Sequence, residues 1–186
     1  MNIALTWDLL VVIFFAIVCA YSFIVGKHES VKIIIATYIA IVAIQGMGNL
    51  IAQFAVYSKS YVDMLGWGFT PEIFSVIKLG AFVALIIFLA IRGGFEMEYN
   101  KDLGTVLESG IVGAFGFSTA GLLLSTLLTY ISGRPLLDPT LATAAPLAPI
   151  LSGSQLMQFM VDYQNLWFAL PALLLMAVGF FSRDAE

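Results

Sequence analysis

The sequence predicts an all-α fold, a polytopic transmembrane helical bundle of four to five spans with one amphipathic helix at the membrane interface. Of the 186 residues, 61% are hydrophobic and only 11% are charged. A soluble domain carries roughly 45–50% apolar and about 25% charged residues, so a single small core cannot hide this excess. The apolar residues also gather in runs close to the ~20 residues that cross a bilayer as a helix. We expect residues 1–186 to form one membrane domain.

Five apolar runs are candidate spans, and the ends of several carry helix signals. Gly26-Lys27 ends the first run, and a tight turn over 26–32 predicts that the first two helices form an antiparallel hairpin. Thr70 suits the cap position before Pro71 at the start of the third helix. Pro171 in the shorter fifth run predicts a kink or partial insertion. The runs cover residues 9–25, 33–54, 71–91, 109–131 and 166–181.

The segment between the fourth and fifth runs has a different character. Residues 133–153 are rich in Pro, Ala and Leu and predict an irregular loop on the bilayer surface. The following stretch, SQLMQFMVDYQ, places apolar residues among polar ones at roughly helical spacing. This pattern predicts an interfacial helix. Its apolar members are Leu156, Met157, Phe159, Met160 and Tyr163.

The distribution of basic residues predicts the orientation, because cytoplasmic loops are enriched in Lys and Arg. One side of the predicted membrane receives Lys27, Lys32, Arg92, Lys101 and Arg183, and the other receives Lys59 and Arg134. The amino terminus is therefore expected outside. Trp7, Trp67 and Trp167 would all lie at the outer interface, as an aromatic belt requires. The segment before the first run, MNIALTWD, has no Lys or Arg and predicts a retained anchor rather than a cleaved signal.

A polar intramembrane face is the least ordinary feature of the second run. Gln45, Asn49 and Gln53 recur every four residues and share one side of a helix. Lipid cannot satisfy carboxamides, so this side must face protein or water. Two interpretations stay open: hydrogen bonds that hold helices together, or a polar pathway.

Two charged residues lie at similar depth to this face. Lys78 lies about 10 Å inside the third helix, given ~1.5 Å per residue. Its ammonium either reaches the interface along its flexible stem or pairs inside the bundle, with Asp8 or with the Asn49–Gln53 side chains. Asp8, at the start of the first helix, also suits the positive end of the helix dipole.

Small residues predict close helix packing along the fourth run. Gly113 and Gly116 widen a ridge whose other members lie on one side of the helix. These members are Gly110, Ala114, Ser118, Gly121 and Ser125.

No constellation of reactive residues predicts catalysis, so an enzyme is not expected. The sequence lacks the GxSxG, HExxH and P-loop motifs, and it has a single His28 and a single Cys19. We therefore expect no metal and no cofactor. No basic tract suggests nucleic acid. The expected partners are membrane lipids and either further copies of the chain or other membrane subunits.

Four elements between residues 7 and 165 form a recognisable pattern: Trp7-Asp8-Leu9, the basic turn at Gly26-Lys27, the glycine-studded GTVLESGIVGAFGFSTAG and Ser154-Gln155-Leu156. In this pattern the chain resembles the colicin V production protein (CvpA) family of bacterial inner-membrane proteins. The family more often has Arg-Gly in its first turn, and it usually ends before the additional apolar helix and short tail at 166–186.

The resemblance implies a location and a broad process. Members are multi-pass proteins of the inner membrane, associated with toxin export and envelope maintenance. We therefore expect a non-enzymatic inner-membrane protein that works within an oligomer or larger assembly. Two alternatives stay open: a small oligomeric pore or transporter that uses Gln45, Asn49, Gln53 and Lys78, and a structural subunit of a membrane complex.

Overall fold

The computed structural model of the chain describes residues 6–57, 71–92, 105–138 and 140–183. Every regular element in these ranges is helical, which confirms the predicted all-α class. The elements are α1 (Trp7–Tyr57), α3 (Pro71–Arg92), α4 (Thr105–Ser132), η1 (Leu141–Thr143), η2 (Ala145–Leu147), α5 (Ala148–Leu151), α6 (Gln155–Asp162) and α7 (Gln164–Arg183).

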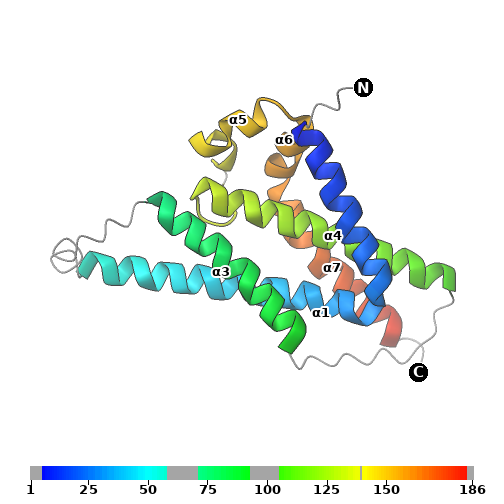
Figure 1. Cartoon of the computed structure of the whole chain (residues 1–186). Helices are drawn as coiled ribbons and strands as arrows, with labels where there is room; N and C mark the ends of the chain where they lie inside the picture. Colours follow the sequence, from blue (N-terminus) through cyan, green and yellow to red (C-terminus); the bar gives the residue numbers. More distant parts are fainter. Residues whose placement is uncertain (1–5, 58–70, 93–104, 139, 184–186) are drawn as a thin grey trace.

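Helix α1 is broken into two arms at Gly26. This glycine has φ 81° and ψ −177°, a left-handed φ that side chains with a Cβ adopt rarely. Ser30 Oγ donates to the Gly26 carbonyl oxygen at 2.8 Å, and the helix resumes at once. The expected turn over 26–32 is therefore wrong in extent: a single residue reverses the chain. The arms diverge as a V rather than lying side by side (Figure 1).

Within the described residues, three helices are long and apolar enough to cross a membrane, and the α6–α7 pair adds a fourth if it counts as one bent span. The long first candidate, Trp7–Ile51, contains the Gly26 break. Helix α3 begins at Pro71, as predicted. Helix α4 begins at Thr105, four residues before the expected start, and α7 continues through Pro171. Residues 141–151, expected to be irregular, form short helical turns.

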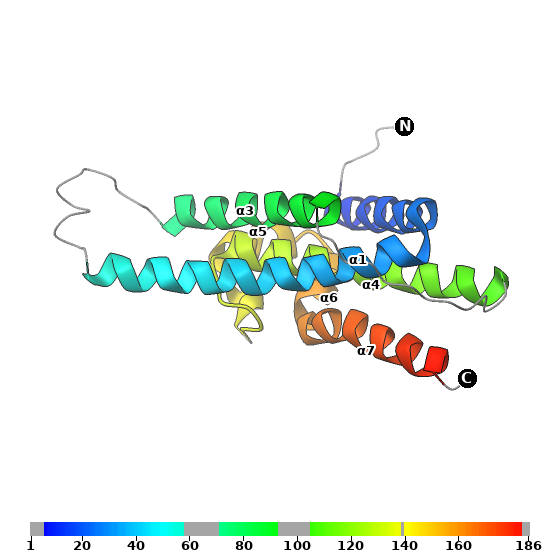
Figure 2. The same cartoon turned by 90° about the horizontal axis from the view of Figure 1, so that it is seen from below.

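Helix α4 is the centre of the bundle. In its membrane-length window 67% of residues are buried, against 11% in α1 and 6% in α3. Both arms of α1, together with α3 and α7, surround it in both views (Figures 1 and 2). Successive helix ends alternate between two sides. The Gly26 bend, the end of α3, the start of α4 and the end of α7 lie toward the lower right of Figure 1.

Candidate functional site

The start of α1 is joined to the start of α6 by a carboxylate. Asp8 Oδ1 accepts hydrogen bonds from Ser154 Oγ at 2.5 Å and from the Leu156 backbone N–H at 3.0 Å. Ser154 is the cap residue of α6, with extended backbone (φ −150°, ψ 120°), and its Oγ accepts from the Met157 N–H at 2.9 Å. We call these three residues, Asp8, Ser154 and Leu156, the Asp8 junction.

This arrangement follows from the needs of a helix start. The first N–H groups of a helix have no partner within the helix. Ser154 satisfies one of them, and Asp8 satisfies another from a distant part of the chain. The negative carboxylate also complements the positive end of the helix dipole. Asp8 thus fixes the direction in which α6 leaves the preceding segment.

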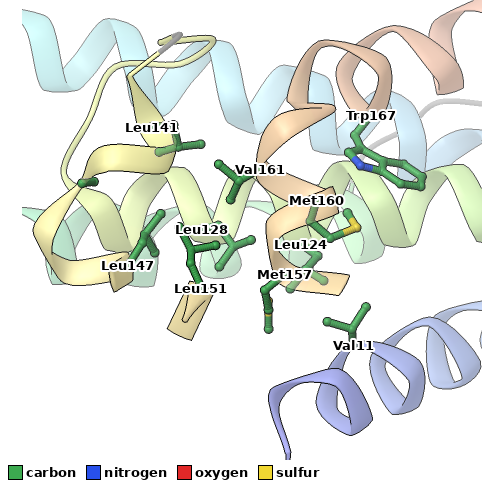
Figure 3. Close-up of a cluster of buried hydrophobic side chains, with 11 residues drawn as sticks. Val11, Leu124, Leu128, Leu141, Leu147, Leu151, Met157, Met160, Val161 and Trp167 are labelled. Carbon is green, nitrogen blue, oxygen red and sulfur yellow. The ribbon is translucent and has the colours of Figure 1, made fainter. Parts of the chain in front are cut away.

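A cluster of buried apolar side chains holds this junction in place (Figure 3). Val11, one turn after Asp8, packs with Met157 and Met160 of α6 and with Leu124 and Leu128 of α4. The segment between α4 and α6 contributes Leu141, Ala144, Leu147 and Leu151 to the same cluster. The amphipathic character predicted for this stretch is therefore realised as a helix whose inner side faces α4. Leu156, Phe159 and Tyr163 point outward and are exposed.

Trp167 belongs to this cluster as well, and this corrects one expectation. The side chain is only 4% exposed and lies within 6.1 Å, between ring centroids, of Phe15, Phe117 and Phe159. It is a core residue and not part of an aromatic belt. Trp7 is 41% exposed, and Trp67 lies outside the described residues.

The polar face of α1 is not buried by the bundle. Gln45 is half-buried, whereas Asn49 and Gln53 are exposed. Gln45 Nε2 lies 3.4 Å from Asn49 Oδ1, a long hydrogen bond within the helix. The carboxamides therefore face outward from the described part of the chain.

Lys78 lies beside this face, against Gly48. A Cβ placed on Gly48 would lie 2.6 Å from Lys78 Cε and 3.1 Å from Nζ. The lysine stem therefore crosses α1 where a glycine leaves space for it. Of the two partners considered for Lys78, the structure places the Gln45–Gln53 segment nearby, while Asp8 is engaged by α6.

The small residues of α4 meet several different neighbours. A Cβ on Gly113 would lie 3.2 Å from the Phe23 ring, and one on Gly116 would lie 3.0 Å from the Cys19 Cα atom. Gly121 lies against the ring of Trp167, and Ser118 is fully buried. Ala114 is half-buried. Gly110, expected in the same ridge, is exposed and has no described atom within 4 Å of an added Cβ.

Three buried or half-buried polar groups are not indicated by the sequence. Gln164 Nε2 donates to Thr129 Oγ1 at 2.7 Å and ties α7 to α4. Tyr38 Oη donates to the Phe168 carbonyl oxygen at 2.6 Å, in the turn before Pro171, where the proline ring disturbs the helix ladder. Lys27, counted only as a loop cation, is 5% exposed at the Gly26 break. Spacing along one helix cannot reveal the Gln164–Thr129 and Tyr38–Phe168 pairs, because each joins two separate helices.

Comparison of the chain with protein-family models, curated proteins and solved structures finds no match. Within the described residues, no three His, Cys, Asp or Glu side chains gather where they could hold a metal ion. Fold and composition thus define the class: an all-helical chain with several helices able to span a membrane.

Proposed function

We propose that the chain is a non-enzymatic, multi-pass inner-membrane protein that resembles the CvpA family and supports export or envelope maintenance within an oligomer or larger assembly. One observation carries the proposal. The resemblance rests partly on Asp8 and on Ser154, which are 146 residues apart in the sequence and hydrogen bonded in the structure. If the likeness to the family were accidental, there would be no reason to expect Asp8 and Ser154 to be in contact.

The same proposal includes five crossings with the amino terminus outside. The two arms of α1 cross first, followed by α3, α4 and the α6–α7 pair. The alternating helix ends in Figures 1 and 2 support this path. The excess of Lys and Arg on one side supports the orientation. In intact cells, a cysteine at position 60 should react with an impermeant thiol reagent, and one at position 100 should not. The opposite pattern would overturn the orientation.

A pore or transporter is the second candidate, and the exposure of the carboxamide face favours it. A water-filled path needs polar side chains that point away from the bundle, as Asn49 and Gln53 do. Lys78 would then contribute a positive charge near the path. A structural subunit of a membrane complex would instead bury this face against a partner.

Complementation in bacteria that lack the protein tests the main proposal. The readouts are toxin export and leakage of a periplasmic reporter enzyme. The double variant Asp8→Asn/Ser154→Ala should fail to restore either process while still inserting at normal levels. Lys78→Met separates the candidates, because a pore should lose its conductance in proteoliposomes. Full complementation by the double variant would remove the Asp8 junction from the function.

A further inference from the structure

The second arm of α1 has one side turned away from the bundle. At 100° per residue, Ile39, Val42, Gly46, Asn49 and Gln53 fall on a single stripe, which we call the outer stripe. All five are exposed, and Val42 is 70% exposed. On the opposite side of this arm, Ala40, Ile41 and Ile44 are buried against α3 and α4. The fold therefore uses one side of the helix and leaves the other available.

The chemistry of the outer stripe does not suit lipid. A carboxamide carries two N–H donors and an acceptor oxygen, and hydrocarbon offers partners for none of them. The 3.4 Å contact between Gln45 and Asn49 leaves most of this capacity unused. A membrane helix with such a side is stable when another polar surface covers that side.

The shape of the outer stripe suits another helix. A Cβ added to Gly46 would meet no described atom within 4 Å, so a neighbouring backbone could approach closely. One turn below, an apolar hollow of about 380 Å³ is lined by Tyr38, Ile39, Val42 and Ala43. The glycine and the hollow are continuous with the carboxamides along the same side.

We propose that the outer stripe docks a second copy of this chain. Copies inserted in the same orientation meet about a two-fold axis along the membrane normal, so the same stripe of each copy forms the contact. Carboxamides suit this symmetry because Asn and Gln both donate and accept hydrogen bonds. The hollow that Val42 lines would lie against the same apolar surface of the other copy. The proposal rests on the membrane function proposed above and names the partner in its assembly.

Disulfide crosslinking in native membranes tests this symmetry directly. In a Cys19→Ala background, single cysteines replace Val42, Gly46 or Asn49. Mild oxidation should convert these chains to dimers several-fold more than chains with cysteine at Met47 or Ile51. Met47 and Ile51 are matched controls, since they are 55% and 49% exposed at similar depth on another side of the same helix. Gly46→Trp should shift the detergent-solubilised protein from dimer to monomer without lowering its unfolding midpoint.

The other possible occupants give different results. Equal crosslinking at stripe and control positions would overturn the proposal. So would an Asn49→Cys chain that stays monomeric and reacts with an impermeant thiol reagent, which indicates water, or one crosslinked to a different protein. Complementation by the unmodified chain and by the Asp8→Asn/Ser154→Ala variant is measured separately. If the crosslink pattern fails but only the unmodified chain complements, the dimer alone is rejected. If the crosslink pattern holds but the unmodified chain does not complement, the function alone is rejected.

Discussion

Helix α4 and the second arm of α1 carry polar residues at similar spacing in equally apolar surroundings, yet the bundle buries one set and exposes the other. In α4, six Ser and Thr side chains are buried: Ser118, Thr119, Ser125, Thr126, Thr129 and Ser132. Along the arm of α1, Asn49 and Gln53 remain exposed. The difference lies in how far each side chain must reach for a partner.

Hydroxyl groups on a helix can bond to their own backbone. Thr119, Thr126 and Thr129 each donate to the carbonyl oxygen four residues earlier, at 2.7–2.9 Å. Such residues can be buried against any neighbour without a polar partner. Among the described residues, the exceptions in α4 are Ser125 Oγ and Tyr130 Oη, each buried with no hydrogen bond. The longer carboxamides depend on groups outside their own turn. The comparison predicts that α4 is sensitive to packing and that the arm of α1 is sensitive to its partners.

The largest expected effect is at Gly121, and it tests the α4 side of the comparison. A leucine there would occupy the space of the Trp167 ring. Overpacking of a core costs typically ~1–3 kcal/mol, and we expect Gly121→Leu to reach the upper end. Unfolding in mixed micelles measures the loss.

Gly110→Leu is the matched control for this prediction. It lies on the same helix, it is exposed, and an added Cβ meets no described atom within 4 Å. Its effect should stay within about 0.5 kcal/mol, as for most surface substitutions. If Gly110→Leu and Gly121→Leu cost the same, the packing of α4 against α7 is not what holds the bundle.

Composition and run length were sufficient to predict the helical membrane class, because both depend on the sequence alone. Helix starts were predictable where a local signal marks them: α3 begins at Pro71, and the amphipathic segment predicted from Ser154 contains α6. The extent of the bend at Gly26 was not predictable from the sequence. Only the positive φ of Gly26 in the structure shows that one residue makes the bend.

The individual residues of the candidate site were predictable from the sequence, but the contacts between them were not. Asp8 and Ser154 were both singled out from the sequence, and nothing in their spacing shows that they meet. Trp167 was assigned to the interface because tryptophan is common there. Contact with Gly121 instead places it in the core. Which side of a helix faces a neighbour depends on all the other helices, and the periodicity of one helix does not contain that information.

The second prediction concerns Asp8, whose carboxylate accepts hydrogen bonds from Ser154 and Leu156 in a distant segment of the chain. Ser154→Ala removes the α6 cap, and loss of a helix cap costs ~0.5–2 kcal/mol. Asp8→Asn should cost less, because an amide oxygen can still accept from the Leu156 N–H while the charge is lost. Asp8→Ala, which removes the acceptor, should cost more than Asp8→Asn.

Asp162→Asn is the control at the other end of α6. Its carboxylate is exposed and lies near the negative end of the helix dipole, so neutralising it should be neutral or slightly stabilising. A loss of stability at Asp162 equal to that at Asp8 would show that the effect is one of net charge and not of the cap.

The third prediction tests how Lys78 lies against the arm of α1. Gly48→Ala places a Cβ only 2.6 Å from Lys78 Cε, which is too close, so the lysine stem must move. The tip of a flexible side chain can move, so we expect a cost of only about 1 kcal/mol. In the Lys78→Ala background the same Gly48→Ala change should cost nothing. A double-mutant cycle measured by unfolding in micelles gives this coupling, and strict additivity would mean that the two residues do not interact.

The smallest expected effect is at Asp138, which finds its partners within four residues in the sequence. Its Oδ1 accepts from the Thr140 N–H at 2.8 Å and from Thr140 Oγ1 at 2.7 Å, and Arg134 Nη1 lies 3.9 Å from its Oδ2. The Thr140 hydroxyl, the Thr140 backbone N–H and then the Arg134 charge hold the pKa of the Asp138 carboxyl below its usual value near 3.8. A lowered folded-state pKa stabilises the fold above the ordinary value, and this stability is lost as the pH falls through the folded pKa. The unfolding midpoint of Asp138→Asn should therefore lie slightly below that of the unmodified chain at pH 6, and the two should converge below pH ~3. A gap that stays constant down to low pH would show that the charge of Asp138 does not contribute, and that its turn is held by the neutral hydrogen bonds alone.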